Sequence, residues 1–215
     1  NALSFSATQR VRVIQQTPAQ LTTKLTLAAW IYPTAVAPAA ILSKGFSTNG
    51  DYSLRLGATL RPQVRFNQQA GGPTFEAARS VALDTWSHVA VTWDKSTGQG
   101  AFYLDGALGS TFPWNGTITT SAENVFVGAD FWDNTFFAGK IDDPAIFARA
   151  LSPGEIAALR VDSLPRNPHW AALAPLSGEI SPGGAQAVTL SADAAILAAE
   201  TYTATVQIAS YDPLN

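Results

Sequence analysis

The chain has 215 residues, of which 47% are apolar and 13% charged, and its formal net charge at pH 7 is -3. This composition is typical of a folded globular protein and excludes a disordered one, and the length allows one full domain with a smaller second one. The thirteen lysines and arginines are scattered, so no basic stripe suits nucleic acid. No apolar run is long enough for a membrane span, and cysteine is absent, which excludes disulfides and thiolate metal sites.

Apolar and polar residues alternate along most of the chain up to residue 150, which is the pattern of β-strands. Residues 25–32 put leucine, alanine and isoleucine side chains on one face, and residues 86–93 do the same with valines and a tryptophan. Both segments are predicted as core strands. Trp30, Trp86 and Trp93 lie in these patterns, so we expect all three in the core.

The clearest turn of the chain is Asp105-Gly106, which separates residues 101–104 from residues 107–112. Aspartate and glycine tolerate positive φ, so a β-hairpin with a two-residue turn is predicted. Short strands interrupted by Gly, Asn, Asp and Ser recur along the chain, with almost no helix signal. The predicted fold class is therefore all-β, an antiparallel two-sheet sandwich.

One short helix is predicted after these strands. Ser152 is a typical N-cap, Pro153 suits the first helical position, and Glu155 can complete a capping box. The apolar residues that follow end near Arg160, so the helix is expected to end there.

A second, smaller module is predicted beyond this helix. Residues 162–168 contain two prolines and are expected to form a linker. The β pattern then returns in residues 187–192 and 201–208. The segment 169–215 is too short for a complete seven-stranded sandwich of about 100 residues, so a partial module is predicted. Its remaining strands would lie beyond Asn215 or come from a neighbour, which makes self-assembly through this module an expectation.

Several motifs follow one another in order along residues 1–161. They are Ala2-Leu3-Ser4-Phe5, Leu27-Ala28-Ala29-Trp30-Ile31, Ile41-Leu42-Ser43-Lys44-Gly45, Trp86-Ser87-His88-Val89-Ala90, Phe102-Tyr103-Leu104-Asp105-Gly106, Phe126-Val127-Gly128 and Gly139-Lys140-Ile141-Asp142-Asp143. In this order they resemble the laminin-G-like jelly roll, a concanavalin A-like fold related to the pentraxins. The resemblance implies a jelly-roll sandwich that binds sugars, mediates adhesion or serves as a structural spacer. Pro144 departs from the family pattern, which indicates an edge strand or a bulge there.

Motifs also occur in the tail. They are His169-Trp170, Pro182-Gly183-Gly184, Tyr202-Thr203-Ala204 and Asp212-Pro213, while Glu200 stands where glycine is usual. Together they resemble a bacterial immunoglobulin-like surface module. The resemblance implies a partial Ig-like β-sandwich over residues 169–215.

Two loops carry the oxygen-bearing side chains that calcium prefers, residues 47–51 and residues 130–134. Pentraxin loops at these two places resemble them and meet around calcium. Two alternatives stay open: Asn, Asp and Gly can serve turn geometry alone, or a metal can be held elsewhere, near Asp142 or Asp143. The resemblance implies a shared calcium site at Asn49, Asp51, Asp130, Asp133 and Asn134.

The second of these loops also offers a sugar contact. Carbohydrate binding needs an aromatic face for the apolar side of a pyranose ring and polar groups for its hydroxyls. Trp132 stands between two aspartates and offers both, with Phe131 and Trp114 as further ligand-binding candidates. The alternative is that these rings close the end of the core, which is the more frequent use of Trp and Phe in a small sandwich.

Catalysis is not predicted. The five glutamates are far apart in the sequence, whereas glycosidases need two carboxylates about 5 to 10 Å apart. Asp142 and Asp143 are adjacent, so on a strand they point to opposite faces. Neither His88 nor His169 has a serine elbow or a metal-ligand spacing around it.

We therefore expect a non-catalytic extracellular module for binding or adhesion, which recognises a glycan or a surface protein through calcium-organised loops. The alternative is a structural subunit or spacer domain in a bacterial surface or filament assembly. Methionine is absent, so Asn1 is expected to follow a removed signal or further domains. We therefore expect an extracellular or cell-surface location. The resemblance of the tail implies a bacterial origin.

Overall fold

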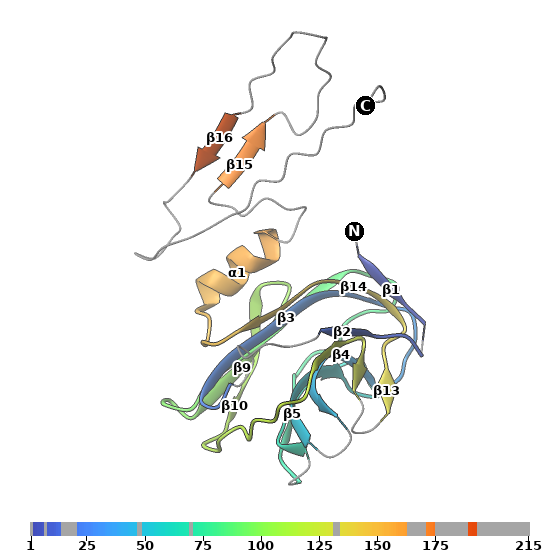
Figure 1. Ribbon diagram of the computed structural model, residues 1–215, viewed down its shortest axis with the longest axis vertical. Coiled ribbons are helices and arrows are strands. Elements are labelled where there is room, and N and C mark those ends of the chain that lie inside the picture. Colours follow the sequence, from blue (N-terminus) through green and yellow to red (C-terminus); the bar gives the residue numbers. More distant parts are fainter. Residues whose placement is uncertain are drawn as a thin grey trace, which may run out of the picture. The chain divides into compact units, whose positions relative to one another are not determined.

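The computed structural model describes residues 2–6, 8–13, 21–46, 49–68, 71–130, 134–162, 171–174 and 189–192. The chain divides into two compact units, Asn1–Val161 and Asp162–Asn215. The first is a sandwich of two antiparallel sheets with a helix on one of them (Figure 1). In this described part of the chain, no helix is long and apolar enough to cross a membrane.

Six strands form each of the two main sheets. Sheet A contains, in spatial order, β1 (Leu3–Phe5), β14 (Gly139–Phe147), β3 (Lys24–Pro33), β8 (Ser87–Asp94), β9 (Gln99–Leu104) and β10 (Ala107–Pro113). Sheet B contains β2 (Val11–Val13), β11 (Val125–Val127), β4 (Ala39–Phe46), β5 (Asn49–Leu56), β6 (Pro62–Phe66) and β7 (Thr74–Glu76). A small hairpin of β12 (Ala129–Asp130) and β13 (Thr135–Phe136) follows β11. The predicted all-β two-sheet sandwich is confirmed.

The core lies between the two sheets, and it corrects one prediction about the tryptophans. Leu27 and Ile31 of β3 face inward and are fully buried, as is Trp93 of β8. Trp30 lies on the opposite face of β3 and is half-buried, while Trp86 precedes β8 and is 38% exposed. The prediction that all three tryptophans lie in the core is therefore wrong for Trp30 and Trp86, because alternation shows which residues share a face but not which face is inward.

The predicted hairpin is confirmed. Asp105 and Gly106 have φ angles of 53° and 78°, so both central residues adopt the left-handed conformation of a tight hairpin turn. They join β9 to β10, whose ladder begins with the pair Leu104 and Ala107.

A bulge at Pro144 is also confirmed. The register between β14 and β3 shifts between Asp142 and Ala145, and Asp143 has a φ of 47°. Proline cannot donate a ladder hydrogen bond, so the bulge accommodates it within an otherwise paired strand.

The helix α1 (Pro153–Asp162) begins with the predicted capping box. The Ser152 backbone N–H donates to Glu155 Oε2 at 2.7 Å, and the Glu155 N–H donates to Ser152 Oγ at 3.3 Å. The helix ends at Asp162, slightly beyond the predicted end near Arg160.

Helix α1 covers the outer face of sheet A (Figure 1). Its Ile156 is fully buried against Ala28 of β3, Ala90 of β8 and Tyr103 of β9. The small alanine side chains leave room for the helix, so this face of the sheet is completed by the chain itself.

The second unit contains the antiparallel pair β15 (Ala171–Ala174) and β16 (Thr189–Ala192). The predicted strand 201–208 and most of the linker lie outside the described residues. The Ig-like module therefore stays a prediction.

Candidate functional site

The outer face of sheet B carries polar side chains in register. Along β5, Leu54 points into the core, so Ser53 and Arg55 on either side of it point outward. The ladder places Ser53 opposite Arg65 of β6 and Arg55 opposite Gln63. Two guanidinium groups, a carboxamide and a hydroxyl therefore share one patch of the sheet, which we call the polar face.

The polar face is buried at one side and open at the other. Arg55 is only 1% exposed, Arg65 of the next strand is half-buried, and Glu76 of the edge strand β7 is exposed. Gln63 Nε2 donates to Glu76 Oε2 at 2.7 Å, which orients the carboxamide at the open side. The polar face is therefore open to solvent at β6 and β7.

The hairpin β12–β13 lies over the buried side of the polar face. Ser43 Oγ of β4 donates to the Ala129 carbonyl at 2.7 Å. Arg55 Nη1 lies 4.0 Å from Asp130 Oδ2, and the two side chains are 2% and 6% exposed. This distance is too long for a hydrogen bond, so the contact is an ion pair that places the hairpin beside the guanidinium.

A glycine directs the chain from β11 into this hairpin. Gly128 has a φ of 79°, and a Cβ there would lie 2.5 Å from the Phe5 ring. Its carbonyl accepts a hydrogen bond from the Phe137 N–H at 2.9 Å. Any side chain at this position would be strained and would collide, so the path of the hairpin depends on glycine.

Asp51, one of the predicted calcium ligands, lies in a buried ion pair. Its Oδ2 accepts hydrogen bonds from Lys44 Nζ at 2.7 Å and from the Ser121 N–H at 2.9 Å. Lys44 Nζ also donates to the Ser121 carbonyl at 2.6 Å. Asp51 and Asp130 thus have separate basic side chains beside them, Lys44 and Arg55.

The other predicted calcium and sugar ligands are less fully described. Asn134 is exposed with a φ of 54°, as expected of an asparagine that serves turn geometry. Asn49 begins β5, while Phe131, Trp132 and Asp133 lie outside the described residues. Among the residues that the structure describes, no group of three or more His, Cys, Asp or Glu side chains could hold a metal. The calcium site and the sugar contact of Trp132 stay predictions.

Trp114 lies at the edge of the core, as the alternative interpretation expects. Its ring stacks on Phe66 at a centroid distance of 4.2 Å and an interplanar angle of 4°. Its carbonyl accepts a hydrogen bond from Trp93 Nε1 at 2.9 Å. One face of the Trp114 ring is therefore already covered by Phe66. The predicted ligand contact of Trp114 would have to use the part of the ring that is still exposed.

His88 lies on the outer face of sheet A in a structural setting. It is 2% exposed, and its ring meets the edge of Trp30 at a centroid distance of 5.5 Å. Burial lowers the pKa of His88 to about 4; the Asp105 carboxylate opposes this shift and the Arg160 guanidinium adds to it. A neutral, buried histidine of this kind serves as a packing residue between its neighbours.

The polar face was not predicted from the sequence. Its signal was present, because polar residues alternate with buried apolar ones in both Tyr52–Leu56 and Pro62–Phe66. What alternation could not show was that these two segments are neighbouring strands and that a hairpin from residues 129–136 lies on them.

Comparison with known proteins agrees with this architecture. Human Pentraxin-4 is 33% identical over 102 residues, which are 42% of this chain and 21% of Pentraxin-4. The chain thus spans about a fifth of the length of that curated relative.

Two solved structures share the fold. The sialidase module CBM40 of Ruminococcus gnavus, bound to α2,3-sialyllactose, has a TM-score of 0.64 and 18% identity over 74% of this chain and 96% of that one. The native heptameric SAP-like pentraxin of Limulus polyphemus has a TM-score of 0.52 and 17% identity over 70% of this chain and 80% of that one.

The family follows from a direct match over most of the chain. Residues 5–157 match the family model described as the Concanavalin A-like lectin/glucanases superfamily. This range begins in β1 and ends within α1, so it contains both sheets and the polar face. The chain belongs to the Concanavalin A-like lectin/glucanases superfamily.

Proposed function

We propose that this chain is a non-catalytic glycan-binding module and that the polar face of sheet B is its binding surface. The observation that carries the proposal is the pairing of Ser53 with Arg65 and of Arg55 with Gln63 on a sheet face that the core does not use. Sugar recognition needs such fixed, planar polar groups, which donate hydrogen bonds to hydroxyls. A structural neighbour of the same fold is described as bound to sialyllactose, which supports the proposal.

The polar face suits a ligand with hydroxyl and anionic groups. Arg65 is half-buried and lies on β6, next to the edge strand β7 at the open side. Arg55 forms the floor, where Asp130 holds it in place. A guanidinium binds a carboxylate with two parallel hydrogen bonds, so acidic sugars are the first class to test.

Aromatic contact is proposed to come from the hairpin. Trp132 and Phe131 lie between β12 and β13, and Asp130 and Thr135 flank them in the hairpin that is anchored on the polar face. Stacking of a pyranose ring on one of these side chains would complete the combination of polar and aromatic groups.

We propose binding without catalysis because each carboxylate at this face already has a basic or amide partner. Asp130 lies by Arg55, and Glu76 accepts from Gln63 and lies 3.5 Å from Arg61. Glycoside hydrolysis needs one carboxyl group placed to protonate the leaving group and a second one across the sugar, and we propose that these two carboxylates serve the structure of the face instead. We also propose an extracellular or cell-surface location, where glycans are met.

A glycan array with neutral and sialylated oligosaccharides tests the proposal. We expect the full chain to bind a subset of the glycans and Arg65→Ala to lose that binding. Arg79→Ala is the matched control, because Arg79 is an exposed arginine outside the polar face. Thermal melting of each variant checks that it folds. If the wild type bound no glycan on the array, this would contradict glycan binding and would favour the structural-spacer alternative.

Calcium is proposed as a loop organiser, and its effect is testable by itself. With the metal at about ten times its dissociation constant, binding would add about 1.4 kcal/mol, or a rise of roughly 3 to 5 °C in the melting temperature. We expect this rise with calcium, its reversal by chelator, and its loss in Asp133→Ala. Magnesium at equal ionic strength is the control. An unchanged melting temperature would contradict the calcium site and leave the glycan proposal untouched.

A further inference from the structure

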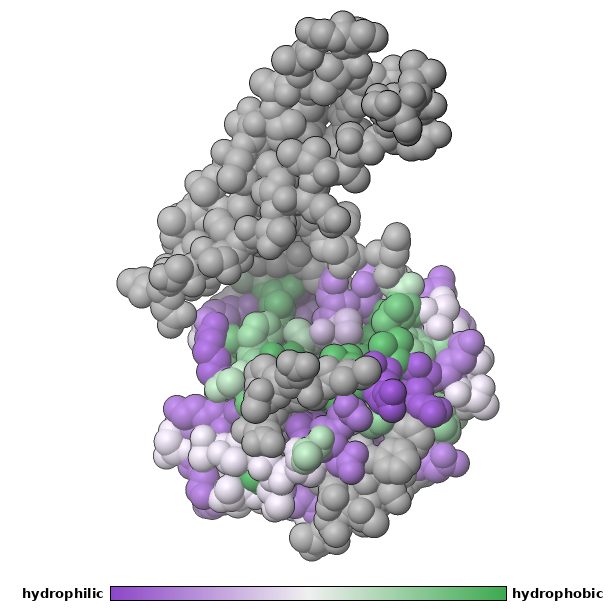
Figure 2. All heavy atoms as spheres, in the orientation of Figure 1, coloured by the Kyte–Doolittle hydropathy of each residue, from purple (hydrophilic) through white to green (hydrophobic). Residues whose placement is uncertain are grey.

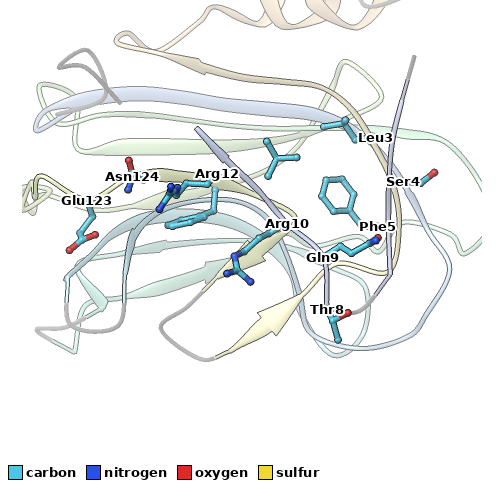
Figure 3. A pocket seen from close by; sticks show the side chains of 11 residues that line it. Leu3, Ser4, Phe5, Thr8, Gln9, Arg10, Arg12, Glu123 and Asn124 are labelled. Atoms are coloured by element: carbon cyan, nitrogen blue, oxygen red, sulfur yellow. The ribbon is translucent and has the colours of Figure 1, made fainter. Parts of the chain in front are cut away.

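The sandwich has a hollow along one side, between an edge strand of each sheet. β1 is the edge strand of sheet A, and β2 is the edge strand of sheet B. A hollow of about 870 Å³ lies between them, and Leu3, Phe5, Val11, Arg10, Arg12 and Glu123 are among the residues that line it (Figure 3). This volume is in the range of known ligand sites.

The hollow leaves part of the core uncovered. Val11 and Val13 pair with the buried Val127 and Val125 of β11 and share their inward face, yet they are 37% and 44% exposed. Leu3 on the facing edge strand is 40% exposed. In the space-filling view, apolar surface lies across the middle of the first unit between polar regions (Figure 2). Exposed apolar surface next to a polar rim is typical of an interaction site.

The backbone of β2 offers an edge for pairing. It forms a ladder with β11 on one side, and no strand among the described residues pairs with its other side. The edge of a sheet presents N–H and C=O groups that can pair with an extended segment. A strand added to β2 would also cover Val11 and Val13 and would form a wall of the hollow.

Charge specifies what such a strand would carry. Arg12 lies on the face of β2 opposite to the two valines, and Arg10 precedes it by two residues. Cross-strand neighbours of opposite charge stabilise a sheet, and like charges directly opposite destabilise it. A second copy of β2 would set arginine against arginine, so it is a poor partner.

We propose that the β2 edge binds an extended segment of another protein in which acidic and apolar residues alternate. The apolar side chains would enter the hollow beside Leu3 and Val11, and an acidic one would pair with Arg12. The site is independent of glycan binding, because β2 and the open β7 side of the polar face are opposite ends of sheet B.

Three peptides test this proposal on the full chain labelled with ¹⁵N. The first alternates valine and glutamate over seven residues, the second alternates valine and lysine, and the third is the first peptide with every backbone nitrogen methylated. We expect the glutamate peptide to shift the amide signals of Leu3, Val11 and Val13, with an apparent affinity roughly five- to ten-fold above that of the lysine peptide. The methylated peptide should lose binding, because it cannot complete a ladder.

Charge reversal on the protein completes the test. Arg12→Glu should bind the lysine peptide in preference to the glutamate peptide, while Arg79→Glu, an exposed arginine outside the site, should keep the wild-type order. Melting curves show whether each variant folds. Equal binding of the methylated peptide, an unchanged order in Arg12→Glu, or no shift with any peptide would overturn the proposal.

Discussion

The outer faces of the two sheets are built by the same alternation of side chains, but different elements cover them. On sheet A the outward positions include Ala28 and Ala90, and α1 packs on them through the fully buried Ile156. On sheet B the outward positions include Arg55 and Arg65, and the small hairpin β12–β13 is held over one side of them. One face is completed by the chain's own helix, whereas the other keeps polar groups open at β6 and β7. This difference is the reason why we propose sheet B as the face for a ligand.

The largest effect is expected where α1 covers sheet A. Ile156→Asp would place a charge in a site that is 0% exposed, so the free energy of unfolding should fall by about 4 kcal/mol. Chemical denaturation measures this. Ala158→Asp is the matched control on the exposed side of the same helix and should change stability by less than about 0.5 kcal/mol. Equal effects of the two substitutions would show that α1 does not depend on packing against sheet A.

A smaller effect is expected at the ion pair of the polar face. Arg55→Ala would leave the buried Asp130 without the guanidinium beside it, at a cost of about 3 kcal/mol in the free energy of unfolding. The double variant Arg55→Met with Asp130→Leu should recover part of that loss, because neither charge is then buried. A double-mutant cycle by denaturation, made of Arg55→Met, Asp130→Leu and the double variant, measures the coupling between the two side chains. Additive losses would show that the two side chains do not act as a pair.

The pH dependence of stability is expected to be smaller again, and it arises on the sheet A face. Because burial lowers the pKa of His88 to about 4, the unfolded chain binds its proton more readily than the folded one. The contribution of neutral His88 is thus fully present well above pH 6.5 and is lost as the pH falls toward 4, with about 2 kcal/mol lost by about pH 5. His88→Gln should flatten the stability curve in this interval. A curve of unchanged slope in that variant would mean that another group titrates.

Much of the fold could be predicted from the sequence because its signals are local. Asp105-Gly106 requires positive φ at both positions, and Ser152 with Glu155 forms a capping box from neighbouring residues. The position of Trp86 could not be predicted in this way, because both faces of the strands around it contain apolar residues.

The site was harder to predict because it depends on contacts between distant segments. Arg55 meets Asp130 across 75 positions of the sequence, and Asp51 meets Ser121 across 70. Each of the two acidic loops could be recognised as rich in oxygen ligands, but the basic partners of Asp51 and Asp130 come from the strands of sheet B. The pairing of Asp51 depends on the register of β4 with β5, and that of Asp130 depends on where the hairpin lies on sheet B; alternation alone gives neither.

The central claim is that the polar face of sheet B binds glycans, and titration calorimetry with the strongest glycan of the array tests it most directly. Removing a charged hydrogen-bond donor costs about 1.5 to 3 kcal/mol, so Arg65→Ala should weaken binding roughly ten- to hundred-fold. Arg79→Ala should bind as the wild type does. Undiminished binding by a folded Arg65→Ala variant would contradict the placement of the site on this face.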